Sequence, residues 1–127
     1  MPAGEAFSER QLREISRTVE AVSVDTGVQF SVFVGRPDED PGEHAERLHK
    51  ALPDPRHSVL VMVAPNERRV EIVTGTEVRH RLSDRDCALA ALSMTSSFSG
   101  GDLVGGIVTG LRMLAEHART PGRSRVP

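Results

Sequence analysis

Acidic side chains gather in one turn-rich segment, and carboxylate oxygens are the ligands that calcium and magnesium prefer. Asp38, Glu39, Asp40 and Glu43 follow an apolar run of strand length. If that run belongs to an open α/β sheet, these carboxylates lie just past its carboxyl end, where such sheets usually bind ligands. Asp38, Asp40 and Glu43, together with Asp102 farther along the chain, are therefore candidate calcium or magnesium ligands.

The same carboxylates also have a structural explanation. Asp40 stands directly before a proline, with Glu43 at the third position after it, an order that is typical of a capped helix start. Asp38 and Glu39 then only solvate a loop beside a favourable helix dipole. Asp102 is expected to cap the last helix in the same way. The sequence leaves both interpretations open.

Three further residues have side chains of the right type for binding or catalysis. Arg56 and His57 precede a buried apolar run and are suited to binding an anion, although ordinary surface residues in a Pro-rich loop look the same. Cys87 lies in the first turns of a predicted helix, where the dipole can lower a thiol pKa. Because no second cysteine and no histidine close in sequence accompany it, we interpret Cys87 as a small packing residue.

Apolar periodicity locates the elements that must hold these side chains. Ser8 and Gln11 form a capping box for a first helix that ends near Gly27. Strands are predicted at 28–34, 59–64 and 70–74, with a short helix after Asp40 and two more helices after Ser83 and Asp102. Residues 76–82 fit either a short edge strand or a connector. The predicted inner stripe of the first helix consists of Leu12, Ile15, Val19 and Val22.

This order predicts an α/β fold with a central mixed sheet of three or four strands flanked by about four helices. The strand, short helix and buried strand between 28 and 64 form a βαβ unit, and the next strand returns as an antiparallel hairpin. We expect one domain over residues 8–118, an N-terminal tail at 1–7 and a disordered C-terminal tail at 119–127.

Glycines crowd the predicted last helix. Gly105, Gly106 and Gly110 fall within six residues, and each interior glycine costs a helix about 1 kcal/mol relative to alanine. A close contact is expected to require them. That contact is either the protein's own packing or a self-association surface.

Composition excludes several classes of function. The chain has 127 residues with 16 basic and 18 acidic side chains, a net charge of −2, which argues against nucleic-acid binding. One cysteine allows no internal disulfide, and the N-terminus resembles neither a secretory signal nor a membrane anchor. We therefore expect a cytoplasmic protein with no membrane contact. No phosphate-binding loop, nucleophile elbow or zinc-protease motif is present in the sequence.

Two stretches resemble known families. Residues 58–84 resemble the core of the TPM domain family, which has an apolar strand ending in Val-Ala, a turn, an arginine, a strand closing on glycine, a leucine and an acidic helix start. Residues 87–114 are similar to an uncharacterised actinobacterial family of unknown function. The TPM-like positions are Val59 to Ala64, Arg69, Val70 to Gly75, Leu82, Asp84, Phe98, Gly101, Asp102, Gly106 and Gly110.

The TPM resemblance implies an α/β sandwich and, in some relatives, phosphatase activity or calcium binding at an acidic rim. The chain departs from the family just before the buried strand, where Arg56-His57-Ser58 replaces the usual Asp-Asn-Gly. We expect a non-enzymatic module that binds a protein partner or forms a homo-oligomer, without a cofactor. The alternative is a metal-assisted phosphatase with Asp38, Asp40 and Asp102 as ligands.

Overall fold

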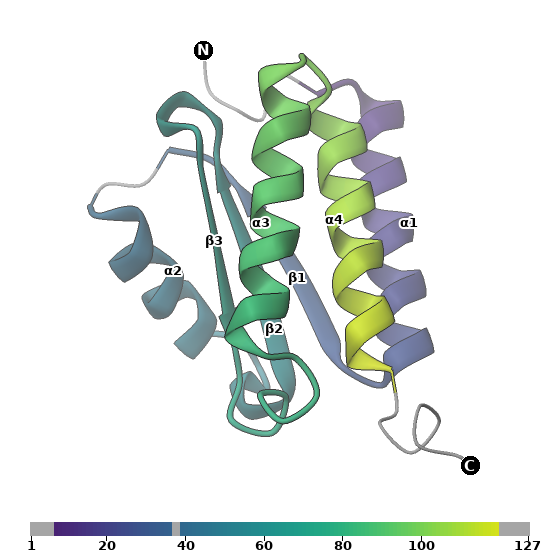
Figure 1. Cartoon of the computed structure of the whole chain (residues 1–127), viewed down its shortest axis with the longest axis vertical. Coiled ribbons are helices and arrows are strands. Elements are labelled where there is room, and N and C mark those ends of the chain that lie inside the picture. Colours follow the sequence, from purple (N-terminus) through teal and green to yellow (C-terminus); the bar gives the residue numbers. More distant parts are fainter. Residues whose placement is uncertain (1–6, 37–38, 120–127) are drawn as a thin grey trace.

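A computed structural model describes residues 7–36 and 39–119 (Figure 1). Three strands form one sheet in the order β1-β2-β3. The predicted α/β fold with a mixed sheet and four helices is confirmed. Residues 76–82 form turns, so the sheet has three strands. The elements are α1 (Glu9–Thr26), β1 (Gln29–Val34), α2 (Pro41–Lys50), η2 (Pro55–His57), β2 (Ser58–Ala64), η3 (Pro65–Glu67), β3 (Arg69–Thr74), α3 (Asp84–Ser99) and α4 (Leu103–Ala118).

Strand β2 is the centre of the sheet, and its neighbours run in opposite directions. β1 lies parallel to β2, with Phe30 opposite Val59 and Val34 opposite Val63. β3 lies antiparallel to β2, with Val63 opposite Val70. The predicted parallel pair and antiparallel hairpin are both confirmed. β1 and β3 are consequently the two edges of the sheet.

The two faces of the sheet are covered unequally. All seven residues of β2 are buried, and alternate side chains point to opposite faces. Val59, Val61 and Val63 belong to the core built with α1, α3 and α4. Leu60 and Met62 belong to a smaller core beneath α2. Three helices therefore cover one face, and α2 alone covers the other, as Figure 1 shows.

The helix ends follow local sequence signals. The capping box of Ser8 and Gln11 is present, and α1 ends at Gly27, whose φ of 76° suits glycine. Ser83 caps α3 with the help of Asp86. Asp102 caps α4 through its side chain.

The rotation of α1 about its own axis differs from the prediction. Its buried residues are Ile15, Thr18, Val22 and Thr26, whereas Leu12 is 45% exposed. The two threonines can be buried because each hydroxyl donates to a carbonyl one turn earlier, Thr18 to Glu14 at 2.9 Å and Thr26 to Val22 at 2.7 Å. Val19 is consequently turned toward β1.

No helix among residues 7–36 and 39–119 has the length and apolar character needed to cross a lipid bilayer.

Candidate interaction site

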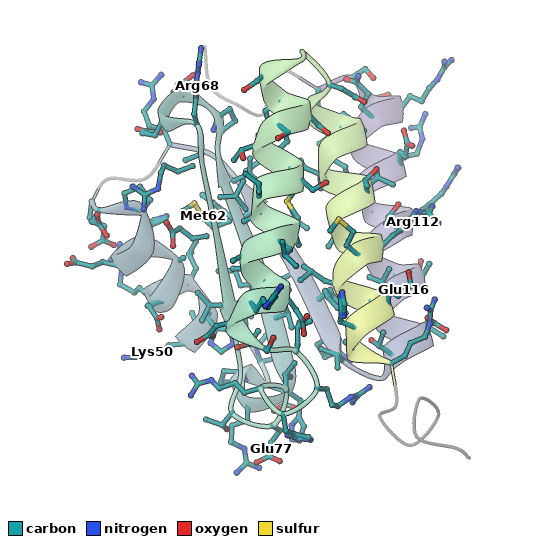
Figure 2. The ribbon with its side chains drawn as sticks, viewed as in Figure 1. Lys50, Met62, Arg68, Glu77, Arg112 and Glu116 are labelled. Atoms are coloured by element: carbon teal, nitrogen blue, oxygen red, sulfur yellow. The ribbon has the colours of Figure 1, made fainter. Side chains whose placement is uncertain are left out.

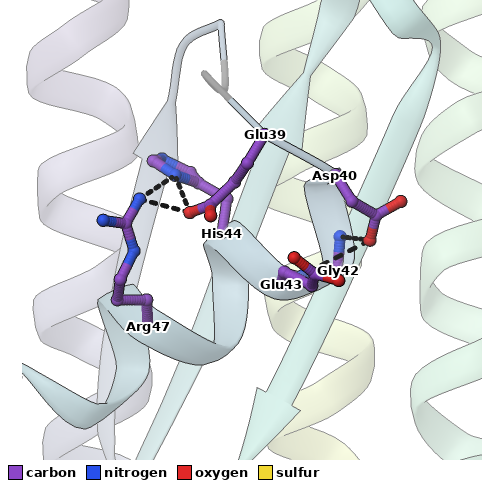
Figure 3. Close-up of polar contacts among 6 residues, drawn as sticks. All are labelled: Glu39, Asp40, Gly42, Glu43, His44 and Arg47. Atoms are coloured by element: carbon purple, nitrogen blue, oxygen red, sulfur yellow. Dashed lines mark hydrogen bonds and ion pairs between the residues drawn. The ribbon is translucent and has the colours of Figure 1, made fainter.

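The acidic segment before α2 is used in local structure (Figure 3). Oδ2 of Asp40 accepts hydrogen bonds from the backbone N–H groups of Gly42 at 3.1 Å and Glu43 at 3.2 Å, which makes Asp40 the helix cap. Glu39 accepts a hydrogen bond from Arg47 and lies 3.4 Å from Nδ1 of His44. Asp38 lies outside the described residues. Within the described part of the chain, no three His, Cys, Asp or Glu side chains are grouped as metal ligands.

Asp102 performs the same task at the start of α4. Its Oδ1 accepts from the N–H of Gly105 at 2.9 Å, and a Cβ at Gly105 would lie 2.1 Å from Oδ2 of Asp102. Glycine at 105 therefore leaves room for this cap. α2 and α4 cover opposite faces of the sheet, so Asp40 and Asp102 cap helices that lie on different faces.

Arg56 and His57 lie at the other end of the sheet from the acidic segment. They immediately precede β2, and the backbone carbonyl of Arg56 accepts from the N–H of Glu77 at 2.9 Å. Figure 2 shows Glu77 at the end of the molecule opposite Arg68, which follows the finish of β2. His57 is exposed, with Nδ1 3.1 Å from the carboxylate of Asp54. The 54–58 loop and the acidic segment thus do not share one cleft.

Cys87 is half-buried and packs against the core on α3. Burial, followed by the charges of Asp84 and Asp86, raises the pKa of the Cys87 thiol from 9.0 to about 11. This shift is opposite in direction to the lowering that a helix dipole would cause, which agrees with the interpretation of Cys87 as a packing residue.

The glycines of α4 serve the contact between α3 and α4. A Cβ on Gly106 would lie 2.8 Å from Cβ of Ser97, and one on Gly110 would lie 2.1 Å from Cε of Met94. Both glycines are buried. Their small size lets α3 approach, so these two positions face the protein's own interior.

The open edge of β1 is the feature that sequence reasoning missed. Gly35 N–H donates to the carbonyl of Val63 at 3.0 Å, which fixes the alternation of the parallel ladder. Ser31 and Phe33 consequently direct their N–H and C=O groups toward β2. Val32 and Val34 direct theirs away from the sheet, where no described residue pairs with them. We call the outward backbone groups of Phe30, Val32 and Val34 the β1 edge.

Helix α1 lies over one face of β1, and a groove of about 670 Å³ remains between the two elements. Only α1 and β1 line it, and we call it the α1–β1 groove. Its apolar residues include Ile15, Val19, Phe30 and Val32, and Ser23 marks one end, where its Oγ accepts from the N–H of Phe30 at 3.0 Å. The remaining lining residues are Ser16, Glu20, Val24, Gln29 and Ser31.

Residues 1–115 match a family described as Domain of unknown function (DUF5130). The chain belongs to the DUF5130 family. Its relatives include uncharacterised proteins from two strains of Mycobacterium tuberculosis, each 31% identical over 88 residues, which are 69% of this chain and 53% of the relative. The chain spans about half the length of these curated relatives. The prediction that the chain belongs to an uncharacterised family is confirmed, and that family is DUF5130.

Solved structures share the fold of this DUF5130 chain. The BA42 protein of the psychrophilic bacterium Bizionia argentinensis is 16% identical with a TM-score of 0.78, over 88% of this chain and 81% of that one. An N-terminal domain from P. gingivalis is 17% identical with a TM-score of 0.76, over 87% and 75% of the two chains. A Corynebacterium glutamicum N-terminal domain is 16% identical with a TM-score of 0.71, over 88% and 74%. At these identities the likeness concerns the fold.

Two sequence signals would have indicated the groove in this DUF5130 chain. Helix α1 carries more apolar residues than one buried stripe needs, and Val24 is 80% exposed. Strand β1 contains no charged residue and no proline. Such a strand is unusual at a free edge, because edge strands commonly carry charges or proline that prevent further pairing.

Proposed function

We propose that the chain is a protein-interaction module whose binding surface is the β1 edge together with the α1–β1 groove. The observation that carries this proposal is the unguarded edge, where Val32 and Val34 present backbone donors and acceptors beside an apolar groove. A strand added there gains ladder hydrogen bonds, each worth about 0.5–1.5 kcal/mol net. Burial of side chains in the groove adds to this.

The proposal is tested by cross-linking in the cells that produce the protein. A photoreactive residue replaces Ser16 in the groove or, as a matched control, Thr109, which is exposed on α4. We expect a discrete protein adduct from position 16 and none from position 109. The substitution Val32→Pro removes an outward N–H and is expected to abolish the adduct. Equal labelling from both positions, or none from position 16, contradicts the proposal.

A second candidate, a metal-assisted phosphatase, is supported by the resemblance of residues 58–84 to the TPM family. Asp40 and Asp102 stand at the starts of α2 and α4, and the cap at Asp40 uses Oδ2 alone. The test is hydrolysis of an aryl phosphate in millimolar calcium or magnesium. Asp40→Asn keeps the cap, since Asn and Asp cap equally well, and removes the charge. Hydrolysis that Asp40→Asn abolishes supports this candidate, and wild-type activity no higher than that of the variant rejects it.

A further inference from the structure

We infer that the occupant of the α1–β1 groove is one extended segment of a partner protein, with apolar side chains at alternate positions and a basic side chain opposite Glu20. This inference rests on the proposed function and adds the chemistry of the partner.

The backbone groups of the β1 edge require an extended occupant. Among the residues that the structure describes, none pairs with the carbonyl of Phe30 or with the N–H and C=O groups of Val32 and Val34, whereas Ser23 accepts from the N–H of Phe30. These groups repeat every second residue along one line. A helix keeps its own N–H and C=O groups paired internally, whereas a strand presents them at this spacing.

The shape of the groove sets the side-chain pattern of that segment. In a strand, side chains alternate between two faces, so every second side chain of an added strand points beneath α1. There it meets Ile15 and Val19 from the helix and lies beside Phe30 and Val32 from β1. The intervening side chains point to the face covered by α2 or to solvent. The partner therefore carries apolar residues with a period of two.

The negative charge of Glu20, at the rim of the α1–β1 groove, sets one position in the side-chain pattern of the bound segment. Glu20 is exposed and is the only charged residue among those that line the groove. Glu20 forms no ion pair with any residue in 7–36 or 39–119. A lysine or arginine in the added segment can pair with this carboxylate and fix the register of the strand.

The width of the helix layer argues against a second copy of this chain. Packed helix axes lie about 8–10 Å apart and strands about 4.8 Å apart, so three helices are wider than three strands by roughly 8 Å. α1 contacts β1 and α3 contacts β3. At these average spacings, each outer helix extends beyond its edge of the sheet by about one strand spacing. Two-fold antiparallel pairing of β1 with its copy brings both overhanging α1 helices onto the same face, where they collide. A single strand fits beneath α1.

The experiment selects binders from a displayed library of short random peptides on the full chain. Four variants are compared with wild type: Val32→Pro, which removes an outward donor; Ser16→Tyr, which fills the groove from an exposed helical position; Glu20→Lys; and Glu14→Lys. Glu14 is exposed on α1 outside the groove lining, which makes its charge reversal the matched control. Urea unfolding and light scattering establish the fold and the mass of each variant.

We expect wild-type binders with alternating apolar residues and a lysine or arginine at one register. Glu20→Lys is expected to select aspartate or glutamate at that register, and Glu14→Lys to leave the preference unchanged. Val32→Pro and Ser16→Tyr are each expected to weaken binding at least about tenfold, the equivalent of one hydrogen bond at the strong end of its range.

Three outcomes overturn the inference. If wild type and Glu20→Lys select peptides with the same residue at that register, the inference of a basic partner residue is refuted. Binders without a period of two, or no binders at all, refute the extended segment. A wild-type dimer that Val32→Pro dissociates makes a second copy the occupant. None of these removes the proposed function by itself, since cross-linking at position 16 tests that independently.

Discussion

The two edges of the sheet present the same kind of backbone but different side chains. On β3, Arg69 and Glu71 form an ion pair, and Nε of Arg79 donates to the carbonyl of Thr74 at 3.3 Å. On β1 there is no charged side chain, and Ser23 satisfies a single N–H at its beginning. Charged edges resist pairing with further strands. The contrast indicates that the side chains of β3 disfavour pairing with a further strand, whereas those of β1 do not.

The largest expected effect concerns amide hydrogen exchange along the two edges. Exchange at Val32 and Val34 should be roughly a thousandfold faster than at Ser31 and Phe33, because amides in the ladder exchange only when the structure opens. The same alternation is expected on β3, where register makes Val70 an outward residue. Two-dimensional NMR in deuterated water measures both. Uniform protection along β1 would show that its edge is already covered.

The next effect compares a covered thiol with one in the groove. Cys87 has a pKa of about 11, two units above its ordinary 9.0, which leaves roughly a hundredfold less thiolate near neutral pH. A Ser16→Cys, Cys87→Ser chain places its single thiol in the open groove. We expect a disulfide probe to label it roughly a hundredfold faster than it labels Cys87 in the wild type.

The pH dependence of the Cys87 thiol has a definite sign. Its rate of labelling should rise about tenfold per pH unit up to about pH 11. As pH rises, the thiol loses its proton in the unfolded chain before it does in the folded chain. The free energy of unfolding should therefore fall as pH rises from about 9 toward about 11. The Cys87→Ser chain should lack this part of the pH dependence. Equal labelling rates for the two thiols at pH 7 would contradict the raised pKa.

The third effect separates the two sides of β1. Proline at Ser31 removes an N–H that faces β2 and leaves the carbonyl of fully buried Val59 without its partner, at a cost of about 1–3 kcal/mol. Proline at Val32 removes an outward N–H and should cost less, since edge strands tolerate proline on their free side. Urea unfolding of Ser31→Pro and Val32→Pro measures the difference. If Val32→Pro lowers the free energy of unfolding more than Ser31→Pro does, the N–H of Val32 and not that of Ser31 faces β2.

Local signals explain why the fold was predictable from the sequence. Caps at Ser8, Asp40, Ser83 and Asp102 depend on residues within one helical turn, and each is present. The apolar run Val59 to Ala64 identified the central strand in the same local way.

The proposed binding surface depends on contacts between distant segments, which the sequence does not display. Burial of Thr18 and Thr26, made possible by their bonds to the helix backbone, rotated α1 and turned Val19 toward the groove. The position of β1 at an edge follows from the order of strands, not from its own residues. The sequence predicts Asp40 and Asp102 as members of one ligand set, and the structure shows each as the cap of a helix, with the two helices on opposite faces of the sheet.

The smallest expected effect concerns the two side chains that satisfy outward groups at the edges. Ser23→Ala leaves the N–H of buried Phe30 without its acceptor and should lower the free energy of unfolding by about 1 kcal/mol. Arg79→Ala should change it by less than about 0.5 kcal/mol, because its bond to Thr74 is longer and Arg79 is exposed. Ser23→Ala should also speed exchange of the Phe30 amide, while Arg79→Ala should leave the β3 amides unchanged. If Ser23→Ala alters neither quantity, water replaces the hydroxyl at no cost, and the β1 edge is open from Phe30 onward, which would lengthen the strand that the groove can bind.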